Sequence, residues 1–206
     1  MACGMWRMIG KRGRRLVGGG RRGFSLVELI AVTGIFALLS AIVLANNTRF
    51  GGSITLEHLA YDVALSVREA QLYGIAVRRT EAGEFSTGYG MHFSLASPNS
   101  YILFADTFEN GLYDGGELVE STTIRSGYGI ADICVSTQAG ETCGINTLNV
   151  VYKRPEPDAC IGTGDVTIGG DGLCTSVRTQ ARVLLTSPRG DRATIAIEST
   201  GQVYVE

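Results

Sequence analysis

The feature that most constrains this chain is an apolar run near its N-terminus, from Phe24 to Ala45, which contains a single acid, Glu28. As an α-helix these 22 residues would extend about 33 Å, which matches the hydrocarbon thickness of a bilayer. The run therefore predicts a membrane-spanning helix over 24–45.

The residues before the run are basic and indicate which side of the membrane they occupy. Residues 1–22 contain no acid and seven bases, which are Arg7, Lys11, Arg12, Arg14, Arg15, Arg21 and Arg22. The positive-inside rule keeps such a segment in the cytoplasm, so the C-terminal part is expected outside it. A cleaved secretory signal would have a shorter apolar core and a small-residue cleavage site. Because 46–48 reads Asn-Asn-Thr, we favour retention of the helix.

Glu28 is the unusual residue within the apolar run. An ionised carboxylate at the centre of a membrane helix costs about 2.5–3.5 kcal/mol and usually marks a function. The position of Glu28 near the cytoplasmic end lowers this cost without removing it. The alternative is that Glu28 only extends to the membrane surface in an ordinary signal anchor.

The residues around Glu28 resemble the N-terminal signature of type IV pilins and type II secretion pseudopilins. The shared pattern is a basic leader that ends in Gly23, then Phe24, then Glu28 and an apolar helix. The resemblance implies cleavage between Gly23 and Phe24 by a prepilin peptidase and methyltransferase, which would also methylate Phe24. It further implies an inner-membrane protein whose helix later packs with other pilin or pseudopilin subunits in a filament. Many members have a proline near the end of the span, where this chain has Ala45.

The chemistry of this signature is consistent with assembly. Cleavage would leave a positive α-amine on Phe24, and the amine of one subunit could pair with Glu28 of its neighbour. Such a pair offsets two charges that would each be costly to bury alone. Glu28 would then set the register of subunit addition.

Charge is distributed unevenly along the 206 residues. The formal charge is −2, and seven of the 18 basic residues lie in residues 1–23. Residues 24–206 therefore carry 11 basic against 20 acidic residues, a formal charge of −9. This balance does not favour binding of nucleic acid.

The chain after the apolar run divides into a hinge and a globular domain, 54–206. Residues 46–53 are polar and contain Gly51 and Gly52, which predicts a hinge or interruption of the helix. Helical periodicity then resumes over 54–74, where apolar residues recur every three or four positions. These residues are Leu56, Leu59, Ala60, Val63, Val67 and Ala70. We expect this stripe to pack on a sheet.

From residue 75 onward, short β-type runs are separated by Gly, Pro, Asn and Asp. We expect strands near 75–79, 90–94, 101–104, 118–124, 130–135, 148–152, 177–186, 192–198 and 202–205, with a tight turn at 199–201. The predicted fold is α+β, with a long N-terminal helix packed on a β-rich, mainly antiparallel, pilin-type domain. Three features more narrowly resemble the GspH/FimT type of minor pseudopilin or minor pilin: the helix that ends in Arg68-Glu69-Ala70, the 101–117 block and the closing hairpin 192–205.

One acidic loop aligns in part with a twelve-residue calcium loop. Asp106, Asn110, Asp114 and Glu117 fall at positions 1, 5, 9 and 12, and Gly111 falls at the turn position. Phe108 at position 3 cannot ligate, and the flanks are predicted to be strands rather than helices. A calcium site and a plain acidic β-turn are therefore the two readings, and calcium is the one cofactor that the sequence suggests.

The cysteines predict disulfides. Cys3 would be lost with the leader, which leaves four cysteines in a domain expected outside the cytoplasm. Four cysteines allow three pairings, of which short loops favour Cys134–Cys143 and Cys160–Cys174. The second pair would close a loop that contains the glycine-rich stretch 162–172. The spacings contain no C-x-x-C, which disfavours a zinc site.

The remaining motifs do not indicate catalysis. His58 and His92 have no H-E-x-x-H companion, and no G-x-S-x-G motif occurs, so no catalytic residue is expected. The tripeptide at 189–191, Arg-Gly-Asp, is also typical of a charged hairpin turn. A basic patch could form from Lys153, Arg154, Arg178, Arg182, Arg189 and Arg192, although scattered solvated charges are the simpler reading.

These observations predict a minor pilin or pseudopilin that primes or caps a filament by protein contacts, in a type IV pilus or a type II secretion pseudopilus. The alternative is a major or tip pilin with an adhesive or DNA-binding role. A membrane-anchored hydrolase is a third class, for which the sequence suggests no nucleophile.

Overall fold

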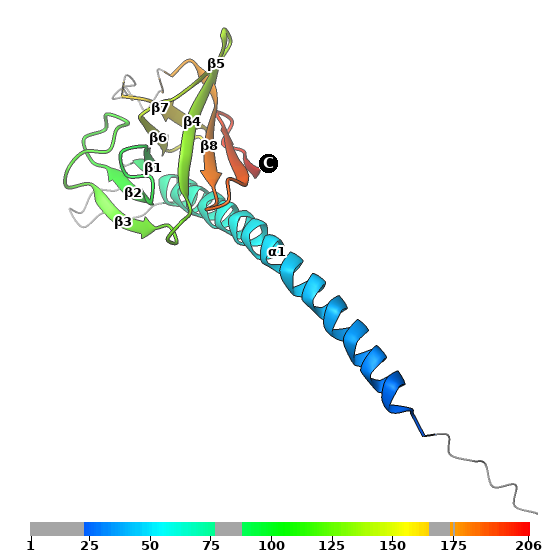
Figure 1. Ribbon diagram of the computed structural model, residues 1–206. Coiled ribbons are helices and arrows are strands. Elements are labelled where there is room, and N and C mark those ends of the chain that lie inside the picture. The colour runs from blue at the N-terminus through cyan, green and yellow to red at the C-terminus, as the bar shows by residue number, and fades with distance from the viewer. Residues whose placement is uncertain (1–22, 77–87, 165–173, 175) are drawn as a thin grey trace, which may run out of the picture. The chain divides into compact units, whose positions relative to one another are not determined.

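The computed structural model describes residues 23–76, 88–164, 174 and 176–206, apart from the side chains of 45–51. It divides into two compact units, Met1–Ala45 and Asn46–Glu206. One helix, α1, runs from Leu26 to Ile75 and contributes residues to both units. Figure 1 labels α1 and the strands β1 to β8.

The first unit contains the apolar part of α1. Leu26–Leu44 is a stretch of 19 residues that is long and apolar enough to cross a membrane, and its side chains are exposed. It begins two residues after the predicted start because Ser25 is not yet helical. The expected membrane helix is therefore consistent with the structure in length and composition.

The second unit is built from the rest of α1 and two antiparallel sheets. Among the described residues the sheets have the strand orders β3-β2-β1-β6-β7 and β10-β9-β8-β4-β5. The strands of the first sheet are β1 (Gly88–Ser94), β2 (Ser100–Asp106), β3 (Leu118–Thr123), β6 (Thr147–Tyr152) and β7 (Ala159–Gly162). Those of the second are β4 (Gly129–Thr137), β5 (Gly140–Cys143), β8 (Arg178–Thr186), β9 (Arg192–Glu198) and β10 (Val203–Val205). The α+β class and the antiparallel sheets are as predicted.

The core joins α1 to the inner faces of both sheets. The predicted stripe contributes Leu56, Ala60, Val63, Val67 and Ala70, all buried, with Leu59 packed at the edge. They lie in one cluster with residues such as Phe93, Leu148, Val183 and Ile195, which alternate along their strands with outward-facing residues. The expectation that this stripe packs on a sheet is confirmed.

The end of α1 is fixed by a close approach to β6. A Cβ atom at Gly74 would lie 2.3 Å from the carbonyl oxygen of Tyr152 and 2.8 Å from its Cβ, so only glycine fits there. The helix ends one residue later, at Ile75, close to the predicted end.

Several predictions about elements need correction. The backbone of 46–53 is helical, so the helix is not interrupted there, and a hinge in this segment stays a prediction. Ile75 is the last helical residue rather than the start of a strand, and 77–79 lie outside the described residues. Strands β5 and β7 were not predicted. The closing hairpin is confirmed, with Gly201 donating to the carbonyl of Glu198 at 2.9 Å.

Candidate functional site

The start of α1 contains the residues for which the resemblance predicts processing, Gly23 and Phe24. Gly23, Phe24 and Ser25 are exposed and not helical, and α1 begins at Leu26. The amide of Glu28 donates to Oγ of Ser25 at 3.3 Å, and the amide of Leu29 donates to the carbonyl of Ser25 at 3.1 Å. Ser25 is therefore the N-cap residue of α1. The Gly23–Phe24 peptide bond lies in exposed, non-helical backbone, which a peptidase can enter without unwinding a helix.

Glu28 lies in the first turn of α1, at the third position after the cap. The unpaired amides of a first turn carry partial positive charge, so a carboxylate there is favourable. The Ser25-x-x-Glu28 spacing is that of a capping box, in which the cap side chain binds the amide three residues later. Sequence reasoning missed Ser25, although this four-residue pattern was the signal for it.

The predicted calcium loop connects β2 to β3, and Asp106 is buried at its start, 1 % exposed. Its Oδ1 accepts from the amide of Asn110 at 3.0 Å, and its Oδ2 accepts from the amide of Gly111 at 2.9 Å. Burial raises the pKa of the Asp106 carboxyl above its ordinary value, and the hydrogen bonds from the two amides oppose that rise. Both carboxylate oxygens are thus directed at the backbone of the loop.

Glu117 closes the same loop and is 2 % exposed. Its Oε1 accepts from the amides of Thr107 (2.7 Å) and Phe108 (3.0 Å) and from the hydroxyl of Thr107 (3.1 Å). Its Oε2 accepts from the amide of Asp114 at 3.0 Å. A buried carboxylate that accepts several amide hydrogen bonds organises a loop as a cap organises a helix.

The other two predicted ligands also bind within the loop. The side-chain amide of Asn110 donates to Oδ2 of Asp114 at 2.6 Å, and its carbonyl oxygen accepts from the amide of Leu112 at 2.9 Å. Among the described residues, the carboxylates of Asp106, Asp114 and Glu117 do not converge within ligand distance of one another. The structure brings the four residues into one loop, where the oxygens of Asp106 and Glu117 accept mainly from backbone amides and Asp114 accepts from the side chain of Asn110. The calcium site stays a prediction.

This loop covers the outer face of the first sheet. Tyr113 packs edge-on against Phe104, with ring centroids 5.6 Å apart, in a small cluster with Val151 and Cys160. Tyr113 also lies 5.1 Å from His92, whose Nδ1 is 2.7 Å from Oδ1 of Asn149. Burial lowers the pKa of His92. His92 therefore lies in a packed contact, while His58 is exposed on α1.

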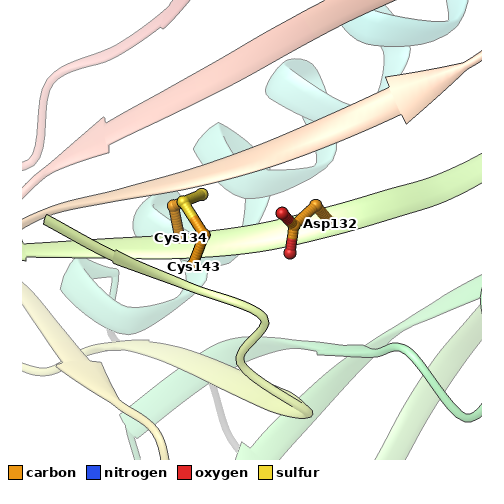
Figure 2. Close-up of side chains that lie close together, drawn as sticks. All are labelled: Asp132, Cys134 and Cys143. Carbon is orange, nitrogen blue, oxygen red and sulfur yellow. A yellow bond between two sulfur atoms is a disulfide. The ribbon is translucent and has the colours of Figure 1, made fainter.

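Both predicted disulfides are formed. Cys134 and Cys143 face each other across β4 and β5, and Cys160 in β7 is bonded to Cys174. Figure 2 shows the first disulfide with Asp132 beside it. These three residues are grouped as metal ligands would be, but the two sulfur atoms are bonded to each other and are not thiolates. Oδ1 of Asp132 accepts instead from the amide of Gly144 at 2.9 Å, which holds the end of the hairpin.

Lys153, Arg178 and Arg182 of the predicted basic patch have individual partners. Lys153 pairs with Glu109 at 3.0 Å, and Arg182 binds the carboxylate of Glu141 through two nitrogen atoms. Arg178 donates to the hydroxyl of Thr163 at 2.7 Å. These three basic side chains therefore already have partners within the chain, without a nucleic-acid ligand.

The Arg-Gly-Asp tripeptide lies in the turn between β8 and β9. The hydroxyl of Ser187 donates to Oδ2 of Asp191 at 2.9 Å and accepts from the amides of Arg189 and Asp191. The carboxylate of Asp191 thus stabilises this turn, which agrees with the interpretation of the tripeptide as a charged hairpin turn.

Comparison with known proteins finds no relative of this chain. No protein-family model, no curated protein and no solved structure matches this chain.

Proposed function

We propose that the chain is a structural subunit of a membrane-anchored filament, processed by cleavage between Gly23 and Phe24. The observation that carries this proposal is one constellation at the head of α1. A basic leader, the Gly23–Phe24 bond and Glu28 precede an apolar segment that is long enough to cross a membrane. The chain would reside in the cytoplasmic membrane before assembly, with the second unit outside the cytoplasm.

The local structure supports the chemistry of this proposal. Cleavage would place a new ammonium group on Phe24, immediately before the N-cap Ser25. That group would meet the positive end of the helix dipole, which is unfavourable. The carboxylate of Glu28, in the first turn, can offset both the dipole and an ammonium group of its own or a neighbouring chain. An apolar helix whose end carries these two charges is suited to packing beside others of its kind.

Within this class, we favour a minor subunit that primes or caps a type IV pilus or a type II secretion pseudopilus. The support is the narrower resemblance to minor subunits, which rests on the helix segment ending at 68–70, the 101–117 block and the closing hairpin. The proposed work is assembly by protein contacts rather than catalysis.

The proposal is tested by the N-terminus of the mature protein. The full chain is produced in a cell with a prepilin peptidase and methyltransferase, purified from the membrane and analysed by intact mass and N-terminal sequencing. We expect a chain that begins at a methylated Phe24. A Gly23→Val variant is the matched control and should retain residues 1–23. A wild-type protein that begins at Met1, or beyond Asn46, would rule the proposal out.

Abundance separates the minor role from the alternative. In sheared fibres, a priming subunit should be scarce relative to the shaft subunit when counted by quantitative mass spectrometry. A protein that dominates the fibres would instead be the major pilin.

A further inference from the structure

The second unit exposes a stripe of apolar side chains on α1. Ile54, Tyr61, Leu65, Leu72 and Ile75 are 49 %, 55 %, 66 %, 66 % and 36 % exposed. We call these five residues the outer stripe. Because successive residues turn by about 100° around a helix, the outer stripe lies on the opposite side of α1 from the buried residues.

The spacing of the outer stripe is that of a coiled-coil seam. Together with His58 and Arg68, its members form the series 54, 58, 61, 65, 68, 72 and 75, in which steps of four and three alternate. This alternation places d and a positions of successive heptads on one face. Five of the seven positions are apolar. Such a seam is complementary to another α-helix, because helical knobs enter its holes at the same spacing.

Two grooves border the middle of the outer stripe. One, of 330 Å³, lies between Tyr61 and Leu65 and the residues Val203, Tyr204 and Val205 of β10. The other, of 460 Å³, lies on the side of Tyr101 and Thr122 and also reaches Leu65. A helix seated on the outer stripe would therefore find space on both sides of the ridge formed by Tyr61 and Leu65.

The positions that flank the seam are acidic. With Ile54 at d, the flanking e and g positions include Glu57, Asp62 and Glu69 and no Lys or Arg. Glu57 and Asp62 are exposed and carry no ion pair within the part of the chain that the structure describes. Arg68, within the seam, donates to the carbonyl of Val203 at 2.9 Å, and the groove beside Tyr101 adds Glu120 and Arg125. Acids outnumber bases by four to two along this face.

This charge pattern selects against a second copy of the chain. In a parallel pair, a g residue faces the e residue five positions later on the partner, which would place Glu57 opposite Asp62. In an antiparallel pair, e residues face e residues, so the registers that overlap most of the seam place Asp62 opposite either Asp62 or Glu69 of the other copy. Each arrangement brings like charges together, which is a recognised means of excluding a partner.

We propose that the outer stripe docks an amphipathic α-helix of a different protein, with heptad-spaced apolar residues and Lys or Arg at its flanks. Five partly exposed side chains offer on the order of a few hundred Å² of apolar surface, below the roughly 800 Å² per partner of a standard interface. The contact is therefore weak in dilute solution and strong only where both partners are held together. The inference goes beyond the proposed function, because it requires neither processing at Gly23 nor a filament.

The test uses the full chain in nanodiscs of zwitterionic lipid and two fluorescent peptides. Both peptides have Leu at a and d; one has Lys at e and g, and the other has Glu. Binding is measured by anisotropy, with empty nanodiscs as the blank. We expect the Lys peptide to bind at least tenfold more tightly than the Glu peptide, with a difference that shrinks as salt is added.

Variants locate the contact and test its charge. Leu65→Ser should weaken binding of the Lys peptide at least tenfold, while Val177→Ser, at a site that is 76 % exposed elsewhere, should not change it. The double variant Glu57→Lys, Asp62→Lys should reverse the preference. Equal binding of both peptides, full binding by Leu65→Ser, or an unchanged preference would overturn the proposal. Self-association that is lost in Leu65→Ser would also overturn it, since a second copy would then be the occupant.

Discussion

The amide of Glu28 donates a hydrogen bond to the side-chain oxygen of Ser25, so the acid that the signature singles out also lies in a helix cap. A cap needs the hydroxyl of Ser25, whereas the proposed pairing with an ammonium group needs the negative charge of Glu28. Substitutions at the two residues can therefore separate the capping role from the proposed assembly role.

Substitutions at these two positions should have different effects on incorporation. Glu28→Gln retains a residue suited to the capping box but removes the charge, so we expect normal insertion and cleavage with poor incorporation into fibres. Ser25→Ala removes the cap, at a cost of about 1 kcal/mol to the helix end, and should be incorporated nearly as well as wild type. Sheared-fibre fractions probed by immunoblot measure both. Normal incorporation of Glu28→Gln would remove the assembly role of the charge.

Glu117→Gln should destabilise the loop that connects β2 and β3. The substituted side chain presents an NH₂ group to at least one amide that now donates to Glu117, so we expect a loss of about 2–4 kcal/mol. Thermal unfolding of the detergent-solubilised chain measures the effect, and hydrogen exchange at Thr107 and Phe108 locates it. Glu120→Gln, at an exposed position of β3, is the control and should change stability by less than about 0.5 kcal/mol.

Calcium should leave the thermal midpoint unchanged. The oxygens of Asp106 accept from the amides of Asn110 and Gly111, and those of Glu117 also face backbone amides, so a cation would have to displace these contacts. Thermal unfolding with millimolar calcium, and with chelator as the control, checks this expectation. A rise in the midpoint that disappears in Asp106→Ala would instead establish the calcium loop that the sequence suggests.

His92 should make the second unit less stable in mild acid. Its pKa is lowered from 6.5 in the folded chain because burial disfavours the charged ring. Unfolded chains therefore bind the proton first as pH falls below about 6.5, and stability is lost until the folded pKa is reached. The midpoint of wild type should fall between pH 7 and 5 by more than that of His92→Gln. Asp106, whose pKa is raised, acts with the opposite sign and is common to both proteins.

Tyr152→Phe should be as stable as wild type or more stable. Tyr152 is fully buried, and its hydroxyl has no hydrogen-bond partner among the described residues. Burial also raises the pKa of Tyr152, because the charged phenolate is disfavoured away from water. Removal of an unsatisfied buried hydroxyl recovers about 1–3 kcal/mol of desolvation, less any packing that is lost. Tyr152→Ala is the contrast and should lose about 3–5 kcal/mol, as other aromatic truncations do. A clear loss of stability in Tyr152→Phe would mean that the hydroxyl has a partner after all.

The strands that could be predicted from the sequence are those whose side chains alternate or form apolar runs. β8 and β9 each place apolar residues on one buried face, and β6 places Leu148, Val150 and Tyr152 in the core at alternate positions. β5, Gly140–Cys143, is exposed throughout, and β7 is only four residues long, so neither has a pattern to detect. Their pairing depends on neighbours that are distant in sequence.

The candidate sites also divide into features that follow from the sequence pattern and features that depend on the folded structure. The disulfide pairs could be predicted because short loops are favoured, and the loop at 106–117 was recognised from its oxygen-bearing side chains. The direction in which the carboxylates of this loop point could not be predicted, because the same spacing allows them to face either a cation or the amides of their own loop. The continuous helix through Gly51 and Gly52 was also missed, since glycine lowers helix propensity without forbidding a helix.

Each sheet ends on one side in a short strand that carries a cysteine, Cys143 in β5 and Cys160 in β7. Outermost strands of four residues are the first to fray, and a frayed margin leaves a row of backbone donors and acceptors open to other chains. The Cys134–Cys143 bond ties β5 to its neighbour β4, whereas β7 is also held at its outer edge, where the amide of Ala159 donates to the carbonyl of Ser199 at 2.8 Å. A reducing environment would therefore first open the border at β5 to pairing with other chains, while the buried interior is still intact.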